Sequence, residues 1–129
     1  MWRDAYHHRR CLVPVTEFYE WTGPAKAKVA HRFHRGGECF FVAGLWEEDP
    51  EFGLCHTMLT TEPNREVAAT GHDRCLVALL DDELDPWLDG QEFELARFRR
   101  PDGMFQVESG VPNPRDRGGD RGPRQGELF

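Results

Sequence analysis

The sequence lacks several features that would assign it to particular classes of protein. No stretch of its 129 residues approaches the ~18 consecutive apolar residues that a membrane-spanning helix requires. No apolar run follows the arginines of residues 1–10, so no secretory signal peptide is predicted. The sequence also contains no C-x-x-C pair and no internal repeat. We therefore expect a single cytoplasmic domain with its own hydrophobic core and no membrane partner.

Cysteine is present but widely spaced. The four residues are Cys11, Cys39, Cys55 and Cys75. Three of them adjoin Leu or Phe, which is typical of small buried side chains in a reducing compartment. A zinc site drawing on Cys55, His56, His72 and Cys75 is an alternative, but the spacing is not that of a known zinc knuckle. We expect no metal and no cofactor.

Basic charge is scarce in the middle of the chain. The net charge is −7, yet residues 1–45 sum to +3, residues 46–96 to −12 and residues 97–129 to +2. Acidic runs such as residues 47–49 and 81–83 are usually solvated surfaces. Both ends of the chain can still present arginine to phosphate, although composition alone does not show that they do.

Short β-rich runs separated by Gly, Pro and acidic stretches predict an α+β fold built on an antiparallel, partly closed sheet. Gly36-Gly37, between two such runs, predicts a β-hairpin that joins residues 28–34 to residues 38–46. Residues 47–53 read as a loop. The expected strands are 11–15, 16–21, 28–34, 38–46, 54–61, 74–80 and 104–109.

Short helices are expected around this sheet. Pro63 in a first turn predicts a helix over residues 64–69. Further helices are expected within residues 2–10 and 81–88, and residues 92–100 fit a helix or a strand equally well. From Gly110 the chain is rich in Gly, Pro and Arg, and we expect residues 117–129 to form a loose tail.

The stretch TEFYEW (16–21) places a carboxylate among aromatic residues. Strand alternation puts Phe18 and Glu20 on one face and Tyr19 and Trp21 on the other. In one interpretation, Glu20 is a strand carboxylate that faces water or pairs with Arg10 or Arg32. In the other, its apolar neighbours raise its pKa. A raised pKa is the usual preparation for a general acid.

His72 is the second candidate for chemistry. It lies between a predicted helix and a buried strand, and Asp73 and Arg74 follow it directly. Loops in such positions often carry functional side chains, and an arginine leading into a strand can hold a phosphate while the histidine handles protons. The alternative is an ordinary loop histidine. The other five histidines have no comparable neighbours.

Five longer motifs occur in a fixed order along the chain. They are RRCLVPVTEFYEW (9–21), FVAGLWE (41–47), TMLTTEPN (57–64), HDRCLVALL (72–80) and VPNPRD (111–116). This set resembles the SRAP family, the SOS response-associated peptidases or abasic-site processing proteins. The resemblance runs from about Trp2 to Asp116. It implies an α+β fold with a curved, barrel-like antiparallel sheet and peripheral short helices.

The resemblance also implies a function in the DNA-damage response, the covalent capture of abasic sites in single-stranded DNA. In the family, the α-amine and thiol of an N-terminal cysteine trap the ring-opened sugar aldehyde as a thiazolidine. Glu20 matches the glutamate of the F-Y-E-W motif, which assists proton transfer at that amine. His72 matches the histidine of the H-D-R motif, which protonates the sugar oxygen during ring opening and assists reversal.

Four residues are expected to contact the DNA. Arg74 matches a phosphate-contacting arginine of the family, Trp21 matches a residue beside the DNA, and Thr60 falls near the same groove. Arg10 is expected to join them as a further cation. A protein with this function would associate with the nucleoid when it acts.

The sequence departs from the family at its start. Full members begin with M-C-G-R and carry an N-A-R-x-E-T motif before the segment that residues 1–10 match, and neither occurs here. We therefore expect residues 1–116 to be the C-terminal portion of an SRAP domain, inactive alone because the nucleophile is missing. The four internal cysteines cannot replace it, since a thiazolidine needs a free amine and a thiol on one residue. Exposed apolar sheet edges would then favour low stability or self-association.

Two other functions remain open. The chain could be a non-catalytic module that binds single-stranded DNA through Arg9, Arg10, Arg74 and Trp21. As such a module it could instead pair with a separately encoded N-terminal half. A literal peptidase using Glu20 and His72 for hydrolysis is the least supported, because the sequence offers it neither a nucleophile nor a metal site.

Overall fold

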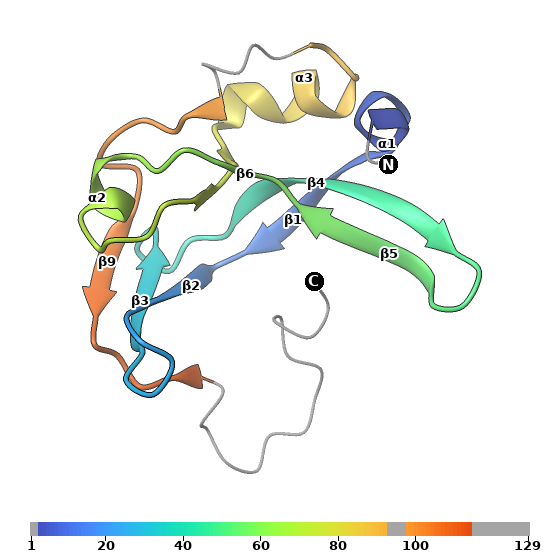
Figure 1. Cartoon of the computed structure of the whole chain (residues 1–129). Coiled ribbons are helices and arrows are strands. Elements are labelled where there is room, and N and C mark those ends of the chain that lie inside the picture. Colours follow the sequence, from blue (N-terminus) through green and yellow to red (C-terminus); the bar gives the residue numbers. More distant parts are fainter. Residues whose placement is uncertain (1–2, 93–97, 115–129) are drawn as a thin grey trace.

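The computed structural model describes residues 3–92 and 98–114 (Figure 1). Antiparallel strands dominate it, and the helices are short, in agreement with the predicted α+β class. The strands are β1 (Arg10–Val15), β2 (Glu17–Thr22), β3 (Val29–His34), β4 (Phe40–Asp49), β5 (Gly53–Met58), β6 (Thr60–Thr61), β7 (Cys75–Leu76), β8 (Ala78–Leu79) and β9 (Gln106–Ser109). The helices are α1 (Arg3–His8), α2 (Arg65–Ala68), the 3-10 turn η1 (Asp81–Glu83) and α3 (Leu84–Leu88).

Strand β4 is the centre of the larger sheet. It pairs with β1 along one edge and with β5 and β8 along the other, always antiparallel. A second sheet has the order β2-β3-β9, and β6 pairs with β7. Within residues 3–92 and 98–114 the strands therefore form separate sheets rather than one closed barrel. None of the helices in these ranges is long and apolar enough to cross a membrane.

A single residue, Thr16, separates β1 from β2, yet these two strands belong to different sheets. Val15 lies opposite Phe40 of β4, whereas Glu17 lies opposite His34 of β3. The chain thus passes directly from the larger sheet into the second one, and Figure 1 shows β1 and β2 following each other along one continuous path.

The predicted hairpin between residues 28–34 and 38–46 is wrong. Gly36 and Gly37 do form a turn, with φ of +72° and +85°, but β3 pairs with β2 and β9 while β4 pairs with β1, β5 and β8. A Gly-Gly turn reverses the chain without choosing its partner, and here it leads from one sheet into the other. Residues 47–53 are also not simply a loop, since β4 continues to Asp49 and β5 starts at Gly53.

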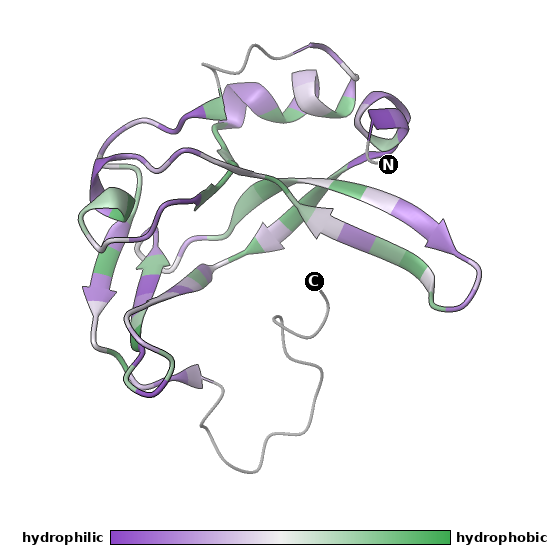
Figure 2. Ribbon diagram, viewed as in Figure 1, coloured by the Kyte–Doolittle hydropathy of each residue, from purple (hydrophilic) through white to green (hydrophobic). Residues whose placement is uncertain are grey.

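Two hydrophobic clusters hold the sheets together. The first joins both sheets, and four phenylalanines form its centre: Phe18 stacks on Phe33 with ring centroids 4.9 Å apart, and Phe105 meets Phe18 edge-on at 5.2 Å while Phe40 packs beside them. The second, around Trp87 and Leu45, seats α1 and α3 on the larger sheet. Figure 2 shows hydrophobic and hydrophilic segments alternating along β3 and β9.

The helix predicted over residues 64–69 is confirmed in its shorter form, α2. Asn64 caps it, because its side-chain oxygen accepts a hydrogen bond from the Val67 N–H at 3.2 Å. The Asn64 amide also donates to the Pro101 carbonyl at 3.0 Å, which fixes the helix to a distant loop. The predicted domain end at residue 116, the tail 117–129 and most of residues 92–100 lie outside the described residues.

Candidate functional site

Strand β2 places Glu20 on the face of the second sheet that carries the core. Phe18 is buried and lies opposite Phe33, and Glu20, two residues on, lies opposite His31. Tyr19 and Trp21 project from the other face, with their rings stacked 6.2 Å apart. The predicted alternation is therefore correct, and the half-buried position of Glu20 follows from it.

The loop after α2 brings His72 to the same place. The Thr70 hydroxyl donates to the Val67 carbonyl at 2.6 Å and accepts from the His72 N–H at 3.4 Å, while Gly71 adopts φ of +93°. The Nδ1 atom of His72 lies 2.9 Å from the Arg74 carbonyl oxygen and 3.2 Å from the Arg74 backbone nitrogen. Backbone contacts therefore hold one side of the imidazole ring and leave Nε2 pointing outward from the loop.

Glu20 and His72 meet. The Glu20 Oε2 and His72 Nε2 atoms are 2.9 Å apart, and the two side chains are 21% and 22% exposed. A proton on Nε2 is donated to the carboxylate, and the pair can exchange that proton with a ligand because neither group is sealed from solvent. The sequence offered Arg10 or Arg32 as partners for Glu20, but Arg32 pairs with Glu17 and Glu108 instead.

Burial sets the acidity of Glu20. Desolvation of the half-buried carboxyl is the largest cause and raises its pKa, the charge of Asp73 raises it further, and His72 opposes both. The net direction is upward from the ordinary value of 4.5. A carboxyl of this kind exchanges protons closer to neutral pH than a surface glutamate does, which suits general acid–base chemistry.

Arg74 lies next to this pair and is anchored by Thr60. Its Nε donates to the Thr60 hydroxyl at 3.2 Å, and its Nη2 donates to the Thr60 carbonyl at 2.9 Å and to the hydroxyl at 3.0 Å. Both residues are exposed. No carboxylate of the described ranges forms an ion pair with Arg74, whereas Arg9, Arg32, Arg99 and Arg100 are all paired in this way. Arg74 therefore offers an anchored positive charge that is available to an anion.

Arg10 has a different position from the other expected DNA contacts. It is only 9% exposed; its Nε donates to the Tyr6 carbonyl at 2.7 Å, and its Nη1 donates to the Trp87 and Gln91 carbonyls at 3.1 and 2.7 Å. The guanidinium also lies between the Tyr6 and Trp87 rings, 4.5 and 4.3 Å from their centroids. The structure thus uses Arg10 to fasten α1 and α3 to β1, and this guanidinium has no free surface for a phosphate.

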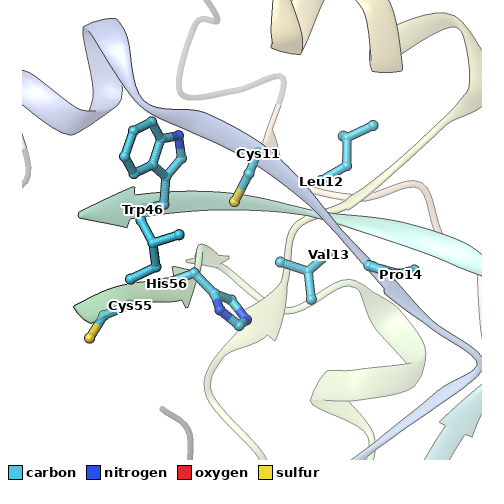
Figure 3. A pocket seen from close by; sticks show the side chains of 8 residues that line it. Cys11, Leu12, Val13, Pro14, Trp46, Cys55 and His56 are labelled. Atoms are coloured by element: carbon cyan, nitrogen blue, oxygen red, sulfur yellow. The ribbon is translucent and has the colours of Figure 1, made fainter. Parts of the chain in front are cut away.

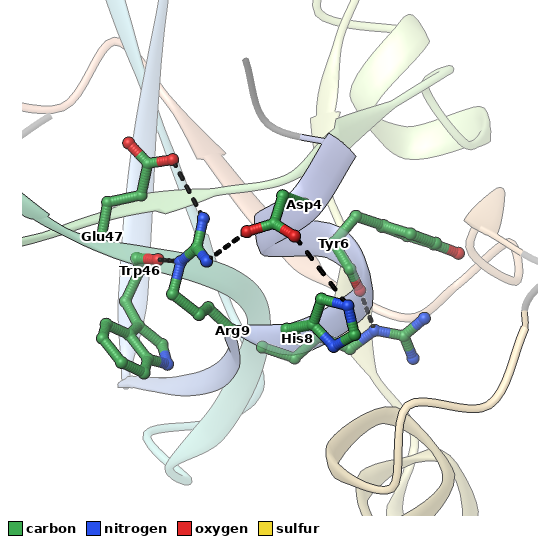
Figure 4. A network of polar contacts seen from close by, with 7 residues as sticks. Asp4, Tyr6, His8, Arg9, Trp46 and Glu47 are labelled. Atoms are coloured by element: carbon green, nitrogen blue, oxygen red, sulfur yellow. Dashed lines mark hydrogen bonds and ion pairs between the residues drawn. The ribbon is translucent and has the colours of Figure 1, made fainter.

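Arg9 is committed in a similar way. Its guanidinium donates to Asp4 at 2.5 Å, to Glu47 at 3.2 Å and to the Trp46 carbonyl at 3.0 Å (Figure 4). These bonds tie α1 to β4 and neutralise the charge. Of the four residues expected to bind DNA in a non-catalytic module, Arg74 lies at the candidate site, whereas Trp21 projects from the face of β2 opposite Glu20.

His31 belongs to the site but has no signal in its local sequence. It is 5% exposed; its Nε2 lies 2.7 Å from the Thr22 hydroxyl and its Nδ1 lies 2.8 Å from the Ser109 hydroxyl. These contacts join β2, β3 and β9 beside Glu20. Its partners come from two other strands, and this is why spacing within the sequence could not identify them.

Metal ligands do not gather in the part of the chain that the structure describes. No three His, Cys, Asp or Glu side chains there are close enough to hold an ion. Burial raises the pKa of the Cys75 thiol to about 12, which favours the protonated form of this side chain. The zinc alternative of Cys55, His56, His72 and Cys75 is therefore not supported.

Comparison with known proteins identifies the family. The family model of the SOS response associated peptidases (SRAP) matches residues 1–109. The chain is 33% identical over 122 residues to the abasic site processing protein YoqW of Bacillus subtilis, a match that covers 84% of this chain and 54% of YoqW. It is 36% identical over 88 residues to the abasic site processing protein YoaM of the same organism, covering 63% of this chain and 38% of YoaM.

Solved structures share the fold. A crystal structure of a protein from Bacteroides thetaiotaomicron matches with a TM-score of 0.67 and 20% identity over 83% of this chain and 51% of that one. A protein from Bordetella bronchiseptica matches with a TM-score of 0.63 and 24% identity over 83% of this chain and 57% of that one. The chain thus spans about half the length of these proteins and of YoqW. On the match of the family model to residues 1–109, the chain belongs to the SRAP family.

Proposed function

We propose that this chain forms part of an abasic-site processing protein of the SOS and DNA-damage response, which captures abasic sites in single-stranded DNA as a covalent crosslink. The Glu20–His72 pair, with 2.9 Å between Oε2 and Nε2, is the observation that carries this proposal, together with Arg74 beside it, which forms no ion pair with a carboxylate of the described ranges. The names of the relatives YoqW and YoaM support it. Such a protein acts in the cytoplasm, at the nucleoid.

The reaction needs two proton transfers that this pair can provide. The abasic sugar must open to its aldehyde, and His72 supplies a proton to the ring oxygen as that bond breaks. An α-amine then attacks the aldehyde carbon, and the thiol of the same residue adds to that carbon, so that a thiazolidine forms and one water leaves. Glu20 takes the proton that the α-amine must lose before it can attack. The upward shift of the Glu20 pKa keeps this exchange close to neutral pH.

In this proposal the nucleophile comes from polypeptide other than residues 1–129. Cys11, Cys39, Cys55 and Cys75 are internal, so their nitrogens are amides and cannot form a thiazolidine. We propose that residues 1–116 act as the C-terminal portion of the domain and that a preceding segment, or a separate half, supplies the N-terminal cysteine. The chain alone is then inactive in crosslinking.

The DNA strand is proposed to pass Arg74, Thr60 and Trp21. Arg74 is held by Thr60 and lacks a carboxylate partner in the described ranges, and so it can bind a phosphate next to the sugar that His72 protonates. Trp21 offers an aromatic surface for a base. Arg9 and Arg10 are left out of this path, because Arg9 pairs with Asp4 and Glu47 and the Arg10 guanidinium is bonded to backbone carbonyls.

A chimaera tests the proposal. The part of YoqW that lies outside its match to this chain is joined to residues 1–129 and incubated with a single-stranded oligonucleotide that carries one abasic site. We expect a product that survives denaturing electrophoresis, and we expect Glu20→Gln and His72→Asn to slow its formation by at least tenfold. Glu17→Gln, on the opposite face of the same strand, is the matched control and should react at the rate of the unmodified chimaera.

The same assay separates the alternative. A non-catalytic module would bind the oligonucleotide with an affinity that falls steeply with salt, yet no denaturation-resistant product would form. Equal rates for Glu20→Gln, His72→Asn and Glu17→Gln would remove the pair from the mechanism.

A further inference from the structure

A hollow of about 410 Å³ lies on one face of the larger sheet, away from Glu20 and His72. Figure 3 shows Cys11 and Val13 of β1, Trp46 of β4 and His56 of β5 around it. Leu12, Pro14, Leu54 and Cys55 complete its lining. The lining is thus almost entirely apolar, although the hollow is open to solvent.

The strand register shows that this face is the continuation of a core. Val13 lies opposite Val42, Cys11 opposite Gly44, and Trp46 opposite His56. Val42 is fully buried in the first hydrophobic cluster, with Val13 packed against it. Along the same face, Leu54 is 72% exposed. The fold therefore covers the end of this face that contains Val42. The end that contains Leu54 is exposed in the part of the chain that the structure describes.

The floor of the hollow is built for close packing. A Cβ atom at Gly44 would lie 2.9 Å from both Cys11 Sγ and Val13 Cγ2 and 3.1 Å from the Thr57 carbonyl. The side chains of β1 thus lean over Gly44 and form a smooth apolar surface between β1 and β5. Such a surface in the middle of a sheet face is typical of a buried contact rather than of a solvated one.

The charge beside the hollow identifies the chemistry of its occupant. Leu54 also borders a second hollow of about 470 Å³, whose lining includes Glu48 and Asp49. Neither Glu48 nor Asp49 forms an ion pair with a described residue. These charges repel the phosphates of nucleic acid and attract a basic side chain. A polypeptide fits both hollows if its apolar side chains fill the first one and a basic side chain reaches Glu48 and Asp49 near the β4–β5 turn.

We propose that this face is the docking surface for polypeptide from the half of the SRAP domain that the relatives contain beyond their match to this chain. The chain spans 54% of YoqW and 51% and 57% of the two solved structures, so a partner of similar size is available to cover the face. The inference rests on the proposed function for the identity of this partner. It adds the surface on which that half packs, which lies on the sheet that does not carry Glu20.

Thiol labelling tests the docking without any DNA, so its result is independent of abasic-site capture. Residues 1–129 are mixed with the part of YoqW outside its match, and the rate at which a maleimide labels each cysteine is followed by peptide mass spectrometry. We expect labelling of Cys11 to slow at least tenfold at saturation. Cys39 is exposed and does not line the hollow, so its rate is the internal control and stays constant.

Two variants of the hairpin sharpen the test. Leu54→Asp places a charge in the hollow and should weaken binding of the YoqW segment at least tenfold, whereas Phe52→Asp should change it less than twofold. Leu54 and Phe52 are 72% and 74% exposed, so neither change disturbs the core, and only Leu54 lines the hollow.

Equal protection of Cys11 in Leu54→Asp and in the unmodified chain would overturn the proposal. A second pair of results would also overturn it. In the first, raising the concentration of residues 1–129 alone protects Cys11 from labelling. In the second, sedimentation shows a dimer of residues 1–129 that Leu54→Asp dissociates. The occupant would then be a second copy of this chain.

Discussion

The Glu20 carboxylate and the His72 imidazole lie 2.9 Å apart, although one is carried by a strand and the other by a loop far along the chain. Each is placed by a different part of the fold. The phenylalanine cluster fixes β2 and hence the face to which Glu20 belongs, while the capped helix α2 and the backbone of Arg74 fix the imidazole. Since the two supports are independent, the acidity of the pair can be altered without removing either one.

The first prediction concerns the acidity of Glu20. Its pKa lies above the ordinary value of 4.5, chiefly through burial. Because the folded-state pKa is raised, the contribution of Glu20 to stability is complete below 4.5 and is lost as the pH rises through the folded-state pKa. The free energy of unfolding of Glu20→Gln, relative to that of the unmodified chain, should therefore rise from pH 4 to pH 7. Urea unfolding of both proteins at the two pH values measures this difference.

Asp73 provides a direct check of this assignment. Its charge raises the Glu20 pKa, so Asp73→Asn should lower that pKa while leaving the fold unchanged. The side-chain carboxyl resonance of Glu20, followed by NMR during a pH titration, gives both values. A pKa at or below 4.5 in the unmodified chain would contradict the prediction.

The second prediction separates two arginines that looked equivalent in the sequence. Arg74→Gln should weaken binding to single-stranded DNA and reduce the slope of log affinity against log salt by about 0.7, the value for one phosphate contact on a single strand. Its stability should change little, because Arg74 is exposed. Fluorescence anisotropy over a range of salt concentrations measures the slope.

Arg10→Gln is the matched variant and should behave in the opposite way. Three backbone carbonyls lose a charged donor, so the free energy of unfolding should fall by about 2 kcal/mol or more. At a temperature where Arg10→Gln is folded, its slope of log affinity against log salt should equal that of the unmodified chain. A reduced slope in Arg10→Gln would show that this guanidinium reaches the DNA after all.

The third prediction concerns the buried ion pair between Arg100 and Glu83. Arg100 Nη1 lies 2.6 Å from Glu83 Oε1 and also donates to the Ala78 carbonyl at 3.0 Å, and both side chains are at least 90% buried. Arg100→Met should cost about 3–5 kcal/mol of unfolding free energy, because it leaves the Glu83 carboxylate buried without its cation. The double variant Arg100→Met/Glu83→Gln should be more stable than Arg100→Met alone, and chemical denaturation tests the order.

The comparison of sequence with structure shows which physical information was local. The alternation of Phe18, Tyr19, Glu20 and Trp21 depends only on the strand period, and it was predicted correctly. The helix α2 was also predicted from a local signal, although Asn64 caps it and Pro63 therefore precedes the cap instead of lying in the first turn. The Gly36-Gly37 hairpin failed because strand pairing is decided by distant residues, namely Phe40 against Val15 and His34 against Glu17.

The candidate site also depends on contacts between residues that are distant in the sequence. The resemblance of motifs assigned Glu20 and His72 to the same reaction, but it did not predict their contact, since no spacing rule connects a strand to a loop so far away in the chain. His31, bonded to Thr22 and Ser109, was passed over for the same reason. Arg10 was expected to join the DNA contacts as a further cation, whereas here the Tyr6 and Trp87 rings enclose it.

The last prediction concerns Gly44, a glycine inside β4 whose role is steric. Its φ is not positive, so the backbone would accept alanine, but a Cβ would lie 2.9 Å from Cys11 Sγ and from Val13 Cγ2. Gly44→Ala should therefore lower the free energy of unfolding by about 1–3 kcal/mol through overpacking. The double variant Gly44→Ala/Val13→Ala removes one of the two clashes, so thermal unfolding should show a smaller loss than the sum of the two single changes. Simple additivity would mean that the β1 side chains do not lean over Gly44, and the close-packed floor of the hollow would then be absent in solution.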